Sequence, residues 1–441
     1  MSSNKFSSIK KVLSNTLGLP TSREDVKSLF KLSLYRNAIY LMLNSAMYAL
    51  TGFFFWIVAA RLYPPEVVGL ASSVIAAIGL LSLLSTLGLD YGLLRFLPAA
   101  GEEAREMINS CFTIGGAVTV VAALVYVAGL SIWSPALLPI RNNLLYFCAF
   151  VIFAFVNTMQ TFNSQCFIAA RQSRFAMIQG WIIGLLRFIP LVLLASSFQK
   201  FGIVAAWGLC VLLSVIIAVT FFQPLAYQGH RPLPVINKDV VGRMLRFSFA
   251  NYIGNIFWMM PSLILPIMVV DLLGPTENAY FYIGWAIAGM VFMIPTAISL
   301  SMLAETSHEV DKLVIEMKRS LRLIFLLLVP VIIVLVFLGH IILQFFGKAY
   351  SDNALQLLWI LAVSAIPMSL NYVYITIRRV EKKMLSVIWL SAFIAITTLV
   401  SSYFLLPVIG IKGAGIGWLI SQCAAALFTL PYLWRRLFRK T

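Results

Sequence analysis

Twelve long apolar runs constrain the fold of this chain more than any other feature. A run of roughly 20 mostly apolar residues crosses the ~30 Å hydrocarbon core of a bilayer. The runs that qualify are 37–60, 67–89, 108–133, 144–168, 175–197, 202–222, 247–270, 279–302, 321–346, 354–375, 384–406 and 413–434. Only 11% of the residues are charged, which excludes an ordinary water-soluble enzyme. Because backbone groups in hydrocarbon must be paired within their own segment, we predict an all-α polytopic membrane protein with about 12 transmembrane helices.

The basic residues are distributed unevenly between these spans. The chain has 33 Lys and Arg against 16 Asp and Glu, a net charge of +17. With the predicted spans, 27 of the basic residues lie on the side of both termini, and five lie on the other side: Arg61, Arg141, Lys200, Lys348 and Lys412. Basic residues collect in cytoplasmic loops, so both termini are predicted to be cytoplasmic. This distribution explains the net charge without a nucleic-acid partner.

Several short patterns recur at a spacing of about 208–210 residues. The turn at 61–66 (RLYPPE) corresponds to 271–276 (DLLGPT), and 171–174 (RQSR) corresponds to 379–382 (RVEK). Six spans per repeat is an even number, so the sequence predicts two parallel six-helix repeats around an axis along the membrane normal, with a cavity between them. Alternating access by rocking of the halves is one interpretation. A duplication that only builds a stable bundle is the other.

These patterns divide the chain into five predicted segments. They are a cytoplasmic N-terminal segment (1–36), an N-terminal six-helix bundle (37–222), a cytoplasmic linker (223–246), a C-terminal six-helix bundle (247–434) and a basic cytoplasmic tail (435–441). The sequence contains no Walker A loop, HExxH motif or GxSxG motif, so no catalytic residue, metal site or cofactor is predicted. The predicted outer loops have only about 5–10 residues, which disfavours a membrane glycan polymerase or ligase.

Arg187 is the basic residue that lies inside a predicted span. It is about halfway along the fifth span, three residues before Pro190, whereas all 16 acidic residues lie in loops or at span ends. An arginine at the bilayer centre costs ~2.5 kcal/mol or more unless it faces water or a partner. One interpretation is a cationic site that holds an anionic group in a transport cavity. The structural alternative is an arginine capped by helix carbonyls, or by Asn157 and Gln160.

Polar side chains also form a stripe along one face of the fourth span. The stripe consists of Asn157, Gln160, Thr161, Ser164 and Gln165. A polar face must look into the bundle or into water. Amides and hydroxyls suit the hydroxyls of a sugar, and they equally suit hydrogen bonds between helices. The same two interpretations apply to Asn44 in the first span and to Asn251 and Asn255 in the seventh.

Three arginines near the predicted cytoplasmic face are further candidates for binding an anionic headgroup. Arg36 and Arg246 precede the first spans of the two halves, and Arg95 follows the second span. Arginine binds phosphate through a planar set of donors. The alternative is that all three are ordinary positive-inside residues beside lipid headgroups.

The segments 60–69 (ARLYPPEVVG) and 87–98 (LGLDYGLLRFLP) resemble the start of Wzx-type polysaccharide flippases of the multidrug/oligosaccharidyl-lipid/polysaccharide (MOP) exporter superfamily. The segments 345–350 (FFGKAY) and 410–417 are similar as well. The resemblance implies a V-shaped pair of six-helix bundles, as in MATE transporters, that flips a polyprenyl-pyrophosphate-linked oligosaccharide to the outer leaflet. It also implies a multi-pass protein of the prokaryotic cytoplasmic membrane, with membrane lipids and other polysaccharide-assembly membrane proteins as partners.

Two other classes of function stay open at this point. A multidrug exporter of the same superfamily, coupled to H⁺ or Na⁺, moves cations and generally needs carboxylates within the membrane. A membrane glycan polymerase or ligase is the third interpretation. For a flippase, coupling to an ion gradient and coupling to the membrane potential, worth ~2.3 kcal/mol per charge per 100 mV, are both compatible with the sequence.

Overall fold

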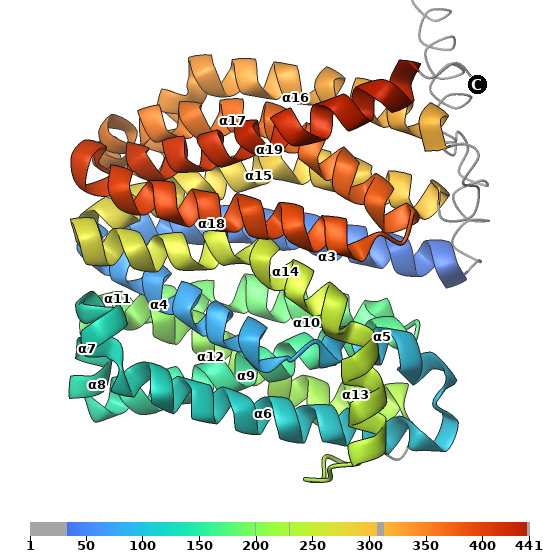
Figure 1. Cartoon of the computed structure of the whole chain (residues 1–441). Coiled ribbons are helices and arrows are strands. Elements are labelled where there is room, and N and C mark those ends of the chain that lie inside the picture. The colour runs from blue at the N-terminus through green and yellow to red at the C-terminus, as the bar shows by residue number, and fades with distance from the viewer. Residues whose placement is uncertain (1–32, 199, 229, 307–312, 439–441) are drawn as a thin grey trace, which may run out of the picture.

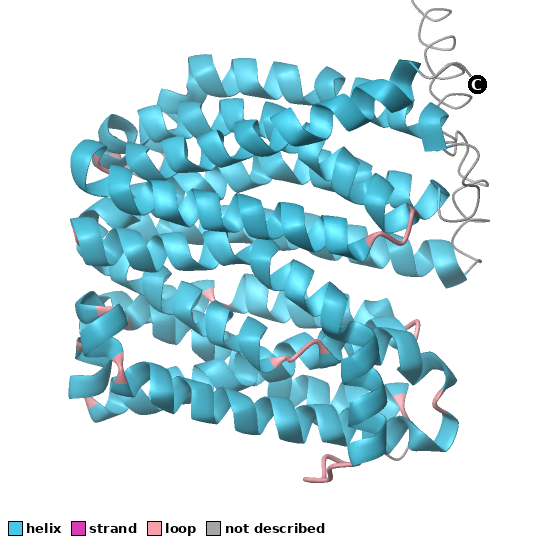
Figure 2. Cartoon of the chain, in the orientation of Figure 1, coloured by secondary structure: helices cyan, strands magenta, loops and turns pink. Residues whose placement is uncertain are grey.

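The computed structural model describes residues 33–438 except 199, 229 and 307–312. Within these residues, twelve helices are long and apolar enough to cross a membrane. The described chain contains helices, turns and loops but no strand (Figure 2). The predicted all-α polytopic fold with about 12 transmembrane helices is therefore confirmed.

Six spans belong to the first half of the chain. They are formed by α3 (Ser33–Leu62), α4 (Pro65–Ser85), α6 (Ala104–Ala128), α9 (Leu144–Ala169), α10 (Ser173–Leu186) with α11 (Phe188–Ser197), and α12 (Gly202–Ile217) with η4 (Ala218–Phe222) and α13 (Gln223–Ala226). The segments α5 (Leu89–Phe96), η1 (Leu97–Ala99) and η2 (Gly101–Glu103) connect α4 to α6. The segments α7 (Leu130–Trp133), η3 (Pro135–Leu137) and α8 (Pro139–Asn142) connect α6 to α9.

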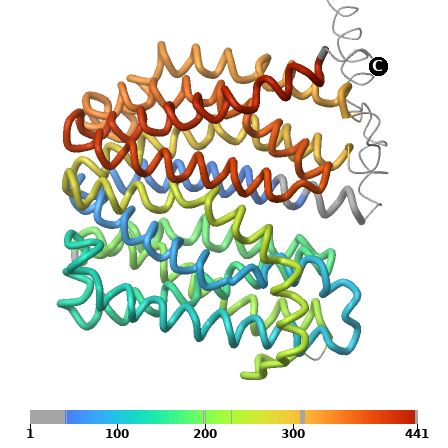
Figure 3. Tube along the Cα trace, in the orientation of Figure 1, coloured from blue at the N-terminus to red at the C-terminus, as the bar shows by residue number. Residues whose placement is uncertain are grey.

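The second half contributes six helices of 26 to 36 residues. They are α14 (Lys238–Leu273), α15 (Pro275–Thr306), α16 (Leu313–Gln344), α17 (Lys348–Val380), α18 (Met384–Ile409) and α19 (Lys412–Phe438). In Figures 1 and 3 most helices of the first half, blue to green, lie in the lower part of the view, and most helices of the second half, yellow to red, lie in the upper part, with α3 and α14 along the boundary. The two halves meet where α14 and α15 contact α4, and α14 also contacts α5.

The two ends of the bundle differ in what they contain. We call "basic end" the end that holds the start of α3, the α9–α10 turn and the end of α19, on the right in Figure 1. The opposite end holds the α3–α4, α14–α15 and α16–α17 turns. By the charge distribution, the basic end is the one predicted to face the cytoplasm.

Polar contacts join the two halves at the opposite end. Arg61 donates from Nε to the carbonyl oxygen of Phe345 (2.9 Å) and from Nη2 to that of Gln344 (2.6 Å). A cation is favoured at the C-terminal end of a helix, which is where α16 presents these carbonyls. The amide of Asn278 in α15 donates to the carbonyl oxygen of Gly69 in α4 at 2.8 Å. The halves are therefore closely joined at this end.

Two connections differ from the sequence-based expectation. The predicted linker, 223–246, includes α13, and α14 already begins at Lys238 within it. Asn237 starts α14, because its side-chain oxygen accepts from the backbone N–H groups of Asp239 and Val240. The connection from α6 to α9 spans 129–143 and is longer than the predicted outer loops, because α6 ends at Ala128.

Small details recur in the two halves. Arg171 in the α9–α10 turn and Lys382 in the α17–α18 turn both have positive φ, 54° and 59°. Asn163 in α9 and Asn371 in α17, 208 positions apart, are fully buried and hydrogen-bonded. These parallels favour the predicted duplication.

Candidate functional site

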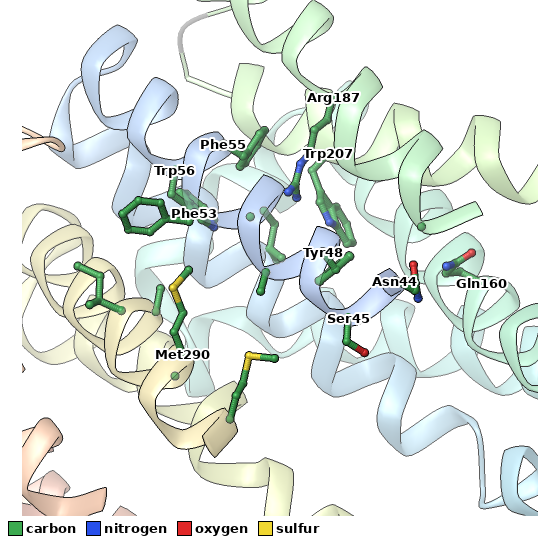
Figure 4. Close-up of a pocket in the computed structure, with 18 of the residues that line it drawn as sticks. Asn44, Ser45, Tyr48, Phe53, Phe55, Trp56, Gln160, Arg187, Trp207 and Met290 are labelled. Carbon is green, nitrogen blue, oxygen red and sulfur yellow. The ribbon is translucent and has the colours of Figure 1, made fainter. Parts of the chain in front are cut away.

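A cavity of about 700 Å³ lies between the two halves. One wall comes mainly from α3, α9 and α10, and α15 provides the facing wall. Figure 4 shows Tyr48 on α3 and Met290 on α15 among the lining side chains. The volume falls in the ~300–1,000 Å³ range that is typical of ligand sites.

The polarity of the cavity changes along its length. Its part nearer the basic end carries the polar side chains Asn44, Ser45, Gln160, Thr161, Ser164 and Gln165. Its part nearer the opposite end is aromatic, with Trp56 and Tyr282 4.6 Å apart and Phe53 and Phe346 5.4 Å apart between ring centroids. Each of these ring pairs joins one residue of each half in an edge-to-face contact. Together with the Arg61 contacts, they close the cavity at the opposite end.

Helix packing and a helix break place Arg187 in this cavity. Pro190 lacks a backbone N–H for the carbonyl of Leu186, so the fifth span breaks between α10 and α11, at Arg187. Gly180 and Gly184, one turn apart on α10, let α3 approach closely. A Cβ atom at Gly180 would lie 2.1 Å from Oδ1 of Asn44, and one at Gly184 would lie 2.7 Å from Oγ1 of Thr51. This is the small-residue packing used between membrane helices.

The guanidinium of Arg187 is buried but has free donors. Arg187 is only 4% exposed, and its Cζ lies 4.5 Å from the ring centroid of Phe55 and 5.9 Å from that of Tyr48. Figure 4 shows the guanidinium beside Phe55 and Trp207. Nε and Nη2 have no hydrogen-bond partner, and the described lining contains no Asp or Glu. A buried cation with two partnerless N–H donors would be stabilised by an anion within hydrogen-bond distance.

Three amides that line the same cavity as this cation also have a partnerless oxygen. Oδ1 of Asn44, Oε1 of Gln160 and Oε1 of Gln165 are buried and accept no hydrogen bond within the protein. A buried acceptor without a partner costs about 1–3 kcal/mol. All three side chains line the cavity. A ligand that carries hydroxyl groups would satisfy these oxygens.

The structure brings together only some of the candidate residues. Arg187, Asn44, Gln160 and Gln165 line one cavity, and Thr161 and Ser164 of the polar stripe line it with them. Asn157, Asn251 and Asn255 are half-buried and are not part of its lining. Asn157 and Gln160 are not hydrogen-bonded to Arg187, so the described contacts do not support the predicted capping.

The arginines proposed for the cytoplasmic mouth lie elsewhere. Arg95 and Arg246 are exposed and do not line the cavity. The Cζ atom of Arg95 instead lies 6.0 Å from the ring centroid of Phe247 in α14. The side chain of Arg36 lies outside the described residues, although its backbone belongs to α3.

Sequence reasoning missed the aromatic residues around the cation. Phe55 and Tyr48 face Arg187, and Trp207 also lines the cavity. In an apolar span, an aromatic residue facing a cavity has the same sequence pattern as one facing lipid. The pair Gly180 and Gly184 was the one available signal, because small residues four apart mark a close helix contact.

Sequence comparison connects the chain to one family. A family model described as "Polysaccharide biosynthesis protein" matches residues 34–304. This range is more than half of the chain and includes Arg187 and most of the cavity walls. A comparison with curated protein sequences found no match.

Three solved transporter structures are similar to this chain. The lipid II flippase MurJ, in an inward closed conformation, has a TM-score of 0.74 at 10% identity and covers 90% of this chain and 87% of its own. An inward-facing multidrug resistance MATE family transporter of the MOP superfamily has a TM-score of 0.68 at 13% identity and covers 91% and 98%. A MOP superfamily transporter from Pyrococcus furiosus Vc1, described as having a binding pocket of reverse polarity, has a TM-score of 0.62 at 13% identity and covers 93% and 96%.

Proposed function

Since the chain belongs to the family of polysaccharide biosynthesis proteins and has the fold of MOP superfamily transporters, we propose that it flips a polyprenyl-pyrophosphate-linked oligosaccharide across the membrane. The resemblance to the superfamily, read from the sequence, is confirmed at the level of family and fold. One observation carries the proposal: Arg187 is a buried cation with two partnerless N–H donors in a cavity between the halves. In the proposed role, the pyrophosphate occupies the space beside these donors.

The polarity of the cavity supports the same substrate. Amide oxygens of Asn44, Gln160 and Gln165 accept hydrogen bonds from sugar hydroxyls in the part nearer the basic end. The aromatic part beyond Arg187 excludes water and thereby strengthens the attraction between the guanidinium and an anion. The isoprenoid chain is apolar, so it lies in lipid or against apolar helix faces outside the polar part.

The contacts between the halves support an inward-facing state. If the basic end faces the cytoplasm, the Arg61 and Asn278 hydrogen bonds close the outer side. Alternating access then requires these contacts between the halves to break. From the resemblance to Wzx-type flippases, we propose that this multi-pass protein lies in the prokaryotic cytoplasmic membrane.

The exporter of cationic drugs is the weaker proposal. A cationic substrate is repelled by Arg187, and the described lining offers no carboxylate to neutralise it. A cavity with one cation selects for anions. The MATE structures resemble this chain in fold, but their substrates do not follow from fold.

Native mass spectrometry of the gently purified protein tests the proposal. We expect co-purified polyprenyl-pyrophosphate glycans with the wild-type protein and their loss in Arg187→Gln. The matched control is Arg322→Gln, which removes a charge at an exposed position outside the cavity and should leave the lipid bound. Equal retention of the glycan lipid by Arg187→Gln would contradict the assigned anion site.

A further inference from the structure

A second, smaller cavity lies next to the main one, within the second half of the chain. It has a volume of about 240 Å³ and lies among α14, α15, α17 and α19. Gly289 and Met293 on α15 line both cavities, so the two spaces adjoin at these residues. The proposed anion site does not use this second space.

Five of the twelve residues that line the second cavity are aromatic. Trp258 lies 4.5 Å from Tyr372 between ring centroids, at an interplanar angle of 66°. Trp285 lies 5.4 Å from Trp418 at an angle of 72°. Because the two rings of each pair are steeply inclined to each other, the cavity wall presents ring faces in different orientations. Flat aromatic faces contact the apolar C–H faces of a ring-shaped ligand over a large area.

The same walls present a small set of polar atoms. Nε1 of Trp418, in a residue only 4% exposed, has no hydrogen-bond partner. The hydroxyls of Ser262 and Thr296 donate to carbonyl oxygens of their own helices, at 2.7 Å each. The Thr296 hydroxyl is also hydrogen-bonded to that of Tyr372, so Ser262 is the one of the two that keeps its full acceptor capacity. The second cavity therefore offers one buried donor and the hydroxyls of Ser262, Thr296 and Tyr372 among aromatic faces, and the last two of these hydroxyls are paired with each other.

We propose that this second cavity binds one pyranose ring of the transported glycan, stacked on tryptophan. A pyranose has apolar C–H faces for the rings and hydroxyl groups at its edge for the donor and acceptors. An isoprenoid chain would leave the N–H of Trp418 buried and unpaired, which is unfavourable. The small volume holds a part of a substrate whose pyrophosphate lies at Arg187. This inference rests on the proposed flippase function.

The test compares two probes that differ only in the sugar. Farnesyl pyrophosphate contacts the anion site alone, and farnesyl pyrophosphate linked to a single pyranose also reaches the second cavity. Affinities are measured by calorimetry on the full chain in nanodiscs, with glucose, galactose and N-acetylglucosamine as the pyranoses. For the wild-type protein we expect at least one sugar to raise the affinity about tenfold, which corresponds to ~1.4 kcal/mol.

Two variants remove this gain in different ways. Gly289→Leu places a side chain in the space shared by the cavities, where an added Cβ meets no atom within 4 Å. Its control is Gly242→Leu, because Gly242 is also helical with open space around its Cβ but lies outside both cavities. Trp258→Ala removes a stacking face, and Trp389→Ala, at a position 74% exposed, is its control. Trp258→Ala, at a position that lines the second cavity and not the main one, should lose the sugar gain and keep wild-type affinity for farnesyl pyrophosphate. Gly289→Leu should lose the sugar gain when each sugar probe is compared with farnesyl pyrophosphate on the same variant.

The outcomes separate this inference from the proposed function. No gain with any of the three sugars in the wild-type protein, or an equal gain in Gly289→Leu and Trp258→Ala, overturns the pyranose site and leaves the anion site standing. Farnesyl pyrophosphate binding that is absent, or unchanged in Arg187→Gln, overturns the proposed function and this inference with it.

Discussion

Replacing Arg187 with glutamine should weaken binding of a pyrophosphate lipid about 100-fold without destabilising the empty protein. Nε and Nη2 of Arg187 are the two donors without a partner. A hydrogen bond to a charged group contributes ~1.5–3 kcal/mol, so losing two of them at the lower value weakens binding by about 3 kcal/mol. Each 1.4 kcal/mol is a factor of about ten in Kd, which gives the expected 100-fold change.

Arg187→Gln should weaken ligand binding, but it should not lower the stability of the protein without ligand. A cation near the bilayer centre costs ~2.5 kcal/mol or more, and stacking on aromatic rings returns about 1–2 kcal/mol. Arg187 contacts the rings of Phe55 and Tyr48 but pairs with no acid in the described structure. The empty Arg187→Gln variant should therefore be as stable as the wild-type protein or slightly more stable.

Thermal unfolding in nanodiscs, with and without farnesyl pyrophosphate, measures both effects. The ligand should raise the Tm of the wild-type protein and of Arg322→Gln, because a ligand that binds the folded state stabilises it. It should leave the Tm of Arg187→Gln unchanged at the same concentration. A clear drop in the Tm of the empty variant together with an unchanged ligand shift would show that Arg187 is structural and would refute this reasoning.

Three further changes test the rest of the structure. Arg61→Ala removes the hydrogen bonds to the carbonyl oxygens of Gln344, the last residue of α16, and of Phe345, which follows it. A cysteine introduced at Ala286 in the cavity should then react faster with an impermeant maleimide added from the opposite end. Unchanged labelling would show that Arg61 does not hold that end closed. Asp90, outside the spans, is buried, and burial raises its pKa from 3.8 to about 6, so stability falls as the pH rises through that range. Asp90→Asn should flatten this pH dependence and add about 1–3 kcal/mol at pH 7; an unchanged slope of Tm against pH would contradict this. Gly69→Ala puts a Cβ 1.7 Å from the carbonyl oxygen of Pro275, so it should lower the Tm by several degrees, whereas Gly242→Ala should not. Equal Tm values for the two variants would show that α4 and α15 separate freely.

The fold could be predicted from the sequence because the bilayer allows few solutions. Apolar runs of span length had to be helices, and all twelve predicted runs correspond to helices of the structure. Helix ends were harder to predict, since polar helical turns continue beyond the hydrocarbon. For this reason α14 begins at Lys238 and not at 247. In contrast, α6 is shorter than predicted at its end, because it stops at Ala128, before Gly129, and not at 133.

The candidate site was predictable only where a residue is out of place in hydrocarbon. Arg187 and the stripe of Gln160 and Gln165 are polar in apolar spans, and they line one cavity. Asn251 and Asn255 gave the same signal but do not line it, because a helical pattern alone does not say which neighbour a face meets. The aromatic walls around Trp258 and Trp285 gave no signal, since aromatic residues are ordinary in spans.

Transport in proteoliposomes tests the central claim most directly. The purified protein is reconstituted with a fluorescent polyprenyl-pyrophosphate-linked glycan, and the fraction of the lipid that crosses to the other leaflet is followed by quenching from outside. We predict protein-dependent flipping that is lost in Arg187→Gln and retained in Arg322→Gln. Flipping no faster than in protein-free vesicles, or equally fast in Arg187→Gln, would contradict the account.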